Sequence, residues 1–225
     1  MRDICYYCKK KSSATGKLKQ KELEKLGNNC NQVSFQKNDK IMTQDMMSKS
    51  ILFIKEGLVK LHARGPEKEQ ILDIIKGPSY IGIPTSVGAK TNQYSATAIS
   101  ETTVCFIIFD VFKEFVIENG EFAYEIISEL SKNQLRSYRK CTNQVQKHSA
   151  GKIAEAILYF SENIFNKEKF ILPLSRNEFG DLTCCTRETV SRILSDLSNN
   201  KIIKVNKNNI TILDKKKLEV ISRMG

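Results

Sequence analysis

Thiols are the side chains of this protein with the widest chemical scope. The chain contains seven cysteines but only two histidines, His62 and His148. Cys5 and Cys8 form a Cys-x-x-Cys pair, and such thiols can bind a soft metal ion or be oxidised. A metalloenzyme with several imidazole ligands is excluded, because the histidines are too few. The cysteines are therefore candidates for a sensor, and small buried side chains at Cys105 and Cys141 are the alternative.

A second set of polar side chains lies on one predicted helix near the C-terminus. After Thr186, the residues on one face of this helix are Arg187, Glu188, Ser191 and Arg192. The opposite face is apolar and is expected to be buried; it carries Val190, Ile193, Leu194 and Leu197. An arginine can donate two hydrogen bonds to guanine, and a carboxylate can accept one from cytosine. This pattern is typical of a recognition helix in the DNA major groove, and the alternative is a solvated, capped helix face.

The segment before this helix predicts how it is positioned. Ser175 and Glu178 have the spacing of a capping box, which starts another helix. Only the short link Thr183–Cys185 separates the two helices, as in a helix-turn-helix.

The segment after the recognition helix predicts a β-hairpin. Apolar residues in 202–205 and 210–212 alternate around a polar turn at 206–209, which makes the motif a winged helix-turn-helix. Lys204 and Lys207 are placed to contact phosphate, which positions a protein on DNA without reading its sequence.

The preceding part of the chain has two different hydrophobic patterns. Apolar runs at 51–54, 58–61, 71–75 and 104–109 are separated by Gly and Pro turns, which is typical of a small antiparallel β-roll. The apolar residues that then recur at helical spacing are Phe122, Ile126, Ile127, Leu130, Tyr138, Cys141 and Val145. A helix of about 27 residues spans about 40 Å, so we expect it to pair with a second copy of itself.

Composition limits the classes of protein that fit. The chain has 225 residues, 36 Lys and Arg against 25 Asp and Glu, and a net charge of +11. Such a basic chain suggests a polyanionic partner, although a Lys- and Asn-rich genome would also raise the charge. The longest apolar run, Val104 to Phe109, is too short to span a membrane, and the N-terminus has no apolar signal core. We therefore expect a cytoplasmic protein with no membrane partner.

Three strings make the assignment more specific: residues 54–61 (IKEGLVKL), 94–98 (YSATA) and 186–194 (TRETVSRIL). With the predicted elements, they resemble the Crp/Fnr family of bacterial transcription regulators. The resemblance implies an α+β fold with an N-terminal antiparallel β-roll (a double-stranded β-helix like a cyclic nucleotide-binding domain), a long dimerisation helix and a C-terminal winged helix-turn-helix. It predicts a sensor roll with an N-terminal helical segment at 1–109, a dimerisation helix region at 110–148 and a DNA-binding domain at 149–225.

The resemblance also implies a function. Glu188, Ser191 and Arg192 fit the Glu-x-x-Ser-Arg arrangement of the family's anaerobic, fumarate–nitrate type, which is associated with a TTGA-like half-site. Arg187 is a feature of the cyclic-AMP receptor branch. We predict a homodimer that reads a palindromic site on double-stranded DNA, with RNA polymerase as a further partner and no enzyme activity. The alternative is a winged-helix protein-interaction scaffold without specific DNA readout.

Two departures from the family pattern concern the turn and the effector. The helix-turn-helix turn commonly carries Gly, but here it carries Cys184. A left-handed conformation costs a non-glycine residue about 1 kcal/mol or more, so we expect the turn to adopt another geometry. The positions that hold cyclic AMP in other members read Gly82, Ile83 and Pro84 in one segment and Tyr94 and Ser95 in another. Neither the carboxylate nor the arginine of the cyclic-AMP binders is present, so we expect another, unknown effector.

The resemblance to oxygen-sensing members points to the cysteines. These members hold an iron–sulfur cluster on four thiolates, and Cys5, Cys8 and Cys105 match three of them. The third N-terminal cysteine is missing, and Cys30 is the nearby thiol that could complete the set. An iron–sulfur or thiol redox sensor is therefore a further alternative.

Overall fold

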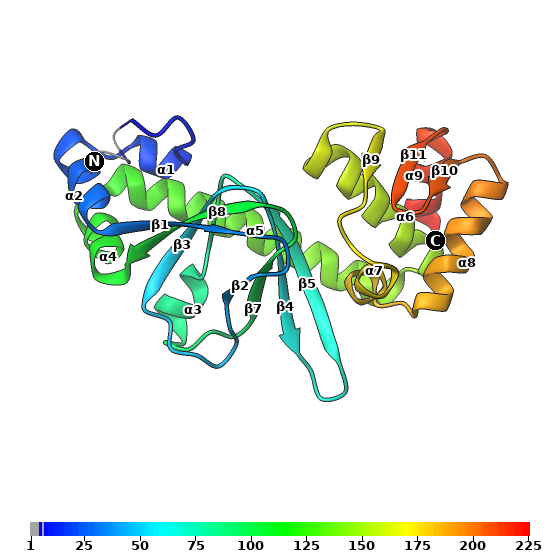
Figure 1. Ribbon diagram of the computed structural model, residues 1–225, viewed down its shortest axis with the longest axis horizontal. Helices are drawn as coiled ribbons and strands as arrows, with labels where there is room; N and C mark the ends of the chain where they lie inside the picture. Colours follow the sequence, from blue (N-terminus) through cyan, green and yellow to red (C-terminus); the bar gives the residue numbers. More distant parts are fainter. Residues whose placement is uncertain (1–4, 6) are drawn as a thin grey trace. The chain divides into compact units, whose positions relative to one another are not determined.

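The structure is a computed structural model that describes residue 5 and residues 7–225. Residues 1–4, in which we found no signal core, and residue 6 lie outside the described residues. The chain forms two compact units (Figure 1). The first comprises residues 1–68 and 72–135, and the second comprises residues 69–71 and 136–225.

The first unit is built on the predicted antiparallel roll. Its strands are β1 (Cys30–Phe35), β2 (Lys40–Met42), β3 (Ser50–Glu56), β4 (Leu58–Arg64), β5 (Glu69–Lys76), β6 (Ser79–Ile81), β7 (Ser95–Ala98) and β8 (Thr102–Ile108). They form two four-stranded sheets with the orders β1-β8-β3-β6 and β2-β7-β4-β5. Gly57 links β3 to β4 with φ at 98°, a conformation that favours glycine. The strands, the long helix and the helix-turn-helix confirm the predicted fold class.

Helices surround the first sheet and close one of two apolar cores. They are α1 (Ser13–Gly16), α2 (Gln20–Asn28), α3 (Ile83–Gly88), α4 (Phe109–Glu118) and α5 (Gly120–Gln146). One core joins residues of α1, α2, α4 and α5 to the sheet that contains β1 and β8, and it includes Phe53, Tyr80 and Phe112. The other core lies between the two sheets and includes Ile54 and Val104.

Helix α5 is the predicted long helix, with 27 residues. Its apolar stripe is partly buried and partly exposed. Phe122 and Ile126 are buried in the first unit, whereas Ile127, Tyr138 and Val145 are exposed. The exposed part of the stripe is the part available to a second copy.

The second unit contains the predicted winged helix-turn-helix. Its elements are α6 (Ser149–Tyr159), the π-helix η1 (Phe160–Phe165), β9 (Lys169–Ile171), α7 (Arg176–Thr183), α8 (Arg187–Asn199), β10 (Ile203–Asn206), β11 (Asn209–Ile212) and α9 (Lys215–Met224). Strand β9 extends the predicted hairpin to three strands in the order β10-β11-β9. Phe160 and Phe179 are fully buried and lie with ring centroids 6.4 Å apart in its core. In the described part of the chain, no helix is long and apolar enough to cross a membrane.

Candidate functional site

The turn between α7 and α8 fixes the start of the recognition helix. Ser175 and Glu178 form the predicted capping box at the start of α7: the Ser175 hydroxyl accepts from the Glu178 amide, and the Glu178 carboxylate accepts from the Ser175 amide. Cys184 ends α7 in a left-handed conformation, with φ at 55°. The expectation of another turn geometry was wrong: the turn keeps the left-handed conformation although it carries Cys in place of Gly. A Cβ at Gly180 would lie 2.5 Å from the Cys185 carbonyl oxygen, so glycine allows this close approach.

Helix α8 presents its predicted polar face to solvent. Thr186 caps the helix, and its hydroxyl accepts a hydrogen bond from the Thr189 amide. The exposed residues of the face are Arg187, Glu188, Ser191 and Arg192, and the opposite residues Val190, Ile193, Leu194 and Leu197 are buried. Their roles on DNA stay a prediction.

The polar face of α8 carries one hydrogen-bond acceptor, the Glu188 carboxylate, and two cationic donors, Arg187 and Arg192. Hydrogen bonds from its own backbone amide and from the Thr186 hydroxyl lower the pKa of Glu188, so this carboxylate is ionised near neutral pH. Arg192 contacts Asp196 one turn away, with Nη1 and Oδ2 3.4 Å apart, and both side chains are mostly exposed. Such an exposed pair contributes little to stability, so the guanidinium is free to exchange its partner for a base.

The wing is held to the helix-turn-helix by a residue that sequence reasoning missed. Lys204 and Lys207 are exposed, as predicted, and Lys207 has a left-handed backbone at the turn between β10 and β11. Arg176, the first residue of α7, donates from Nη2 to the Lys207 carbonyl oxygen at 2.7 Å. Partial burial lowers the pKa of Arg176. Its only sequence signal was a basic residue directly after the Ser175 cap.

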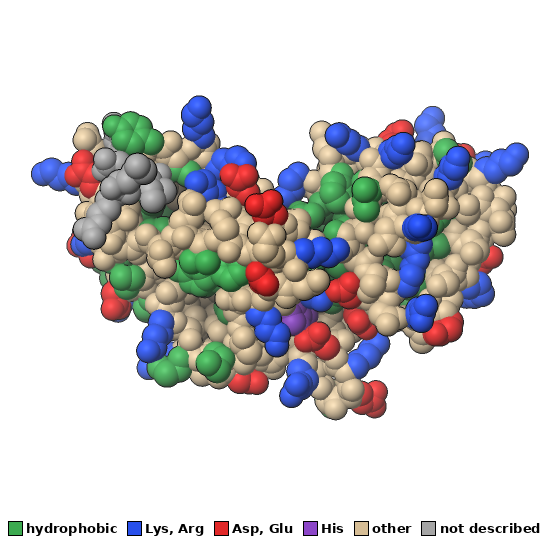
Figure 2. Space-filling model, viewed as in Figure 1, with side chains coloured by type: hydrophobic (Ala, Val, Ile, Leu, Met, Phe, Trp, Pro, Cys, Tyr) green, Lys and Arg blue, Asp and Glu red, His purple; other side chains and the backbone are tan. Residues whose placement is uncertain are grey.

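Basic side chains are numerous in this unit. Figure 2 shows Lys and Arg side chains spread over the C-terminal unit, with fewer acidic ones between them. This distribution is suited to a polyanionic surface.

The predicted effector positions form a closed contact in the roll. The Gly82 amide donates to the Tyr94 hydroxyl at 3.0 Å, and Ile83 is buried whereas Pro84 is exposed. Ser95 accepts from the Gln44 amide at 3.0 Å. Burial raises the pKa of Tyr94, so its hydroxyl stays neutral. The Tyr94 hydroxyl therefore occupies the Gly82 amide.

The four predicted sensor thiols lie together. Cys5, Cys8, Cys30 and Cys105 all line one apolar cavity of about 30 Å³ in the first unit. They come from the N-terminal segment, from the start of β1 and from β8. Lys11 and Lys55 also line it.

Cys30 is the centre of this group, because it hydrogen-bonds to both Cys5 and Cys105. These bonds lower the pKa of Cys5 and of Cys105, and they raise the pKa of Cys30. Lys11 and Lys55 further lower the pKa of Cys5. Cys30 therefore stays protonated, whereas Cys5 and Cys105 lose their protons more easily.

This arrangement does not fit the iron–sulfur cluster that the resemblance implies. Among the described residues, no group of three or more His, Cys, Asp or Glu side chains could hold a metal ion. The cavity of about 30 Å³ has room for one water molecule.

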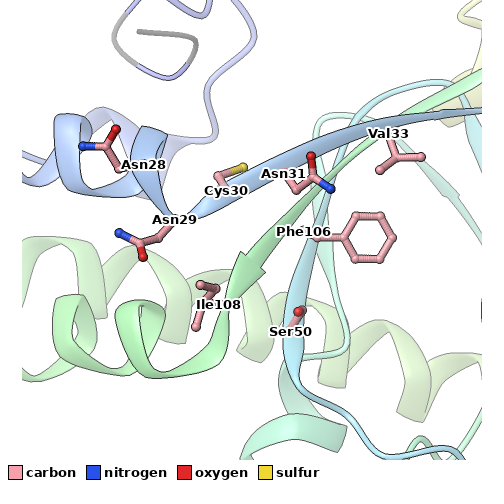
Figure 3. A pocket seen from close by; sticks show the side chains of 8 residues that line it. All are labelled: Asn28, Asn29, Cys30, Asn31, Val33, Ser50, Phe106 and Ile108. Atoms are coloured by element: carbon pink, nitrogen blue, oxygen red, sulfur yellow. The ribbon is translucent and has the colours of Figure 1, made fainter. Parts of the chain in front are cut away.

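Two further features of the first unit lie near the thiols. Tyr80 lines the cavity, hydrogen-bonds to Thr15 at 2.7 Å, and its amide donates to Glu129 of α5 at 3.4 Å. Burial raises the pKa of Tyr80 to about 12. Figure 3 shows Cys30 at the start of β1, directly after the end of α2, where it also lines an open hollow of about 500 Å³.

Comparison with known proteins gives matches in both units. The cyclic nucleotide-binding domain matches residues 32–119, and the Crp-like helix-turn-helix domain matches residues 151–221. The nitrogen fixation regulation protein FixK of Bradyrhizobium diazoefficiens is 26% identical over 208 residues, which are 90% of this chain and 85% of that protein. The transcriptional activator protein Anr of Pseudomonas protegens is 24% identical over 170 residues, which are 73% of this chain and 69% of that protein. The structure of FixK2 from Bradyrhizobium japonicum matches with a TM-score of 0.78 and 18% identity, and the match covers 85% of this chain and 96% of that one.

Proposed function

Because the chain belongs to the Crp/Fnr family of DNA-binding transcription regulators, we propose that it binds a palindromic site on double-stranded DNA as a homodimer. The family consists of regulators rather than enzymes. The observation that carries the proposal is the exposed polar face of α8, which combines an ionised Glu188 with Arg187 and Arg192. Glu188 accepts from cytosine, and the arginines donate to guanine or phosphate. A TTGA-like half-site is the sequence that we expect this face to read.

The wing adds affinity without specificity. Lys204 and Lys207 contact phosphate on the flank of the site, and Arg176 holds the wing turn in place for them. Releasing counterions from these phosphates makes the affinity depend strongly on salt.

The exposed stripe of α5 forms the dimer seam. Tyr124, Tyr138 and Val145 lie on one helical face at multiples of seven residues, and they are 71%, 62% and 81% exposed. Ile127 and Leu135 extend this apolar face. Leaving these apolar side chains in water is unfavourable, and their spacing is suited to a coiled-coil partner. With the seam closed, two copies of α8 read half-sites one DNA turn apart.

Regulation of DNA binding starts in the roll. Tyr80 lines the thiol cavity, and its amide donates to Glu129 of α5, so a structural change at the thiols is passed to the dimer helix through Tyr80. This route supports regulation of DNA affinity from the first unit.

The test is selection of DNA sequences by the full-length dimer, followed by affinity measurements on the selected duplex and a scrambled one. Arg192→Ala and Glu188→Ala should each weaken binding to the selected duplex by about 1–3 kcal/mol, or about 5- to 150-fold, and change binding to the scrambled duplex much less.

Charge variants distinguish phosphate contacts from base contacts. Lys204→Gln and Lys207→Gln should weaken both duplexes alike and lower the salt slope by about one each. Lys216→Gln, an exposed site on α9, is the matched control and should change neither affinity. Equal affinity for every duplex would instead support the protein-interaction scaffold.

A further inference from the structure

We propose that Cys5 and Cys30 are a hydroperoxide-reactive thiol pair, which forms a reversible disulfide with Cys5 as the sulfur that is oxidised first. Both line the same small cavity of about 30 Å³, and both pack against the same apolar core of the first unit. The pair lies in the first unit, so its chemistry is independent of how the second unit reads DNA.

Cys5 has the environment of a reactive thiol. Its side chain is partly exposed, so a small oxidant can reach it. Lys11 and Lys55 line the same cavity and place positive charge beside it. The hydrogen bond from Cys30 and these charges lower the pKa of Cys5, which favours the nucleophilic thiolate.

Cys30 is the partner that completes the disulfide. It stays protonated as the donor to Cys5, and it reaches the solvent through the open hollow that it also lines. The segment that carries Cys5 is held nearby, because Lys10 pairs with Glu56 of β3 at 2.7 Å and Thr15 bonds to Tyr80.

Cys105 is less suited to this bond although it also contacts Cys30. In the pairing of β1 with β8, Cys30 lies opposite Ile107 and Cys105 lies opposite Gln32. Cys30 and Cys105 are therefore diagonal neighbours, whose Cα atoms are about 7–8 Å apart in a regular sheet. A disulfide needs Cα atoms within about 6.8 Å, and rigid paired strands resist that shift. The N-terminal segment that holds Cys5 has no such constraint from strand pairing.

The chemistry balances with one hydroperoxide. The Cys5 thiolate attacks one peroxide oxygen, the O–O bond breaks, an S–O bond forms, and the leaving alkoxide or hydroxide takes up a solvent proton. The Cys30 sulfur then attacks the Cys5 sulfur, the S–O bond breaks, and the hydroxyl leaves as water with the Cys30 proton. Two thiols lose two electrons, and the peroxide gains two.

The test treats the reduced full-length protein with one equivalent of hydrogen peroxide and then blocks the remaining thiols. Trypsin places Cys5 and Cys8 together on residues 3–9 and Cys30 on residues 26–37. A linked pair of these peptides in the mass spectrum, found also in Cys8→Ser, identifies the Cys5–Cys30 bond. Cys30→Ser should remove the link and leave a sulfenic acid at Cys5 that a dimedone probe traps. Cys8→Ser and Cys105→Ser should keep the link, and a thiol reductant should reverse it.

Three results would overturn the proposal. The first is a different disulfide in place of this link: an internal bond of peptide 3–9, which would join Cys5 to Cys8, or a link of that peptide to the one that contains Cys105. The second is the absence of both the link and the trapped sulfenic acid at equimolar peroxide. The third is stoichiometric iron and acid-labile sulfide in protein purified without oxygen, because the thiols would then be cluster ligands.

Discussion

The two units of this protein differ in how their functional groups are brought together. In the C-terminal unit, the residues proposed to read DNA lie within seven positions of one another on a single helix, α8. In the N-terminal unit, the thiol group joins Cys5, Cys30 and Cys105, which are far apart in the chain. A site on one helix depends on capping and helical spacing, whereas a site made of three segments depends on strand register and tertiary packing. The two sites should therefore respond differently to mutation.

Phe179→Ala should have the largest effect, and it tests whether the two units unfold independently. Phe179 is fully buried between α7 and the core of the second unit, and removing such a ring costs about 3–5 kcal/mol. Denaturant unfolding followed by circular dichroism should show an early loss of C-terminal structure. Peroxide should still link Cys5 to Cys30 in this variant.

The control for this variant is Leu213→Ala, at a side chain that is 55% exposed, which should leave the unfolding curve unchanged. Loss of the Cys5–Cys30 link in Phe179→Ala would mean that the two units fold as one.

Cys184→Gly tests a local feature of the C-terminal unit, the left-handed backbone at the end of α7. A left-handed conformation costs a non-glycine residue about 1–2 kcal/mol, and glycine loses part of this gain to unfolded-state entropy. We expect the variant to gain about 0.5–1 kcal/mol in free energy of unfolding, measured by denaturant titration. Cys184→Ala keeps the Cβ and should show no such gain; equal gains in both would assign the effect to the thiol instead of the backbone.

Glu129→Gln should have the smallest effect and tests the N-terminal unit. Burial is the main cause that raises the pKa of Glu129 above the ordinary value of 4.5, so the folded state holds its proton more tightly than the unfolded state. Glu129 therefore favours folding at acidic pH and loses this contribution as the pH rises from about 4.5 through its raised pKa. Glutamine keeps the acceptor for the Tyr80 amide without the charge, so thermal unfolding should show a slightly higher Tm at neutral pH and a flatter pH profile. A Tm that falls equally at every pH would show that the carboxylate itself is needed.

The same contrast explains what the sequence could predict. Both capped helices, the buried face of α8 and the wing hairpin were predictable, because Ser175, Glu178 and Val190 act on neighbours within a few residues. Strand β9 and helix α9 were not predicted. Strand β9 has three residues, which are too few for a periodic pattern, whereas α9 is amphipathic and buries Leu218.

The thiol group could be predicted only in part. Cys105 and Cys30 were candidates, but the register that sets Cys30 opposite Ile107 depends on how β1 pairs with β8 across more than 70 residues of chain. The contact of Arg176 with Lys207 also joins segments 31 residues apart, so no local pattern revealed it. The closed contact of Tyr94 with Gly82 was likewise a matter of tertiary packing, although the missing charges were already visible in the sequence.

The hydrogen bond from Arg176 to the Lys207 carbonyl has a consequence for the entropy of DNA binding. A wing turn that is already held in one conformation loses little freedom when its lysine meets a phosphate, because most of that freedom was lost on folding. The contact therefore shifts an entropic cost from association to folding. For the same number of phosphate contacts, this chain should retain its wing contribution in short encounters with non-specific DNA as well as on its own site.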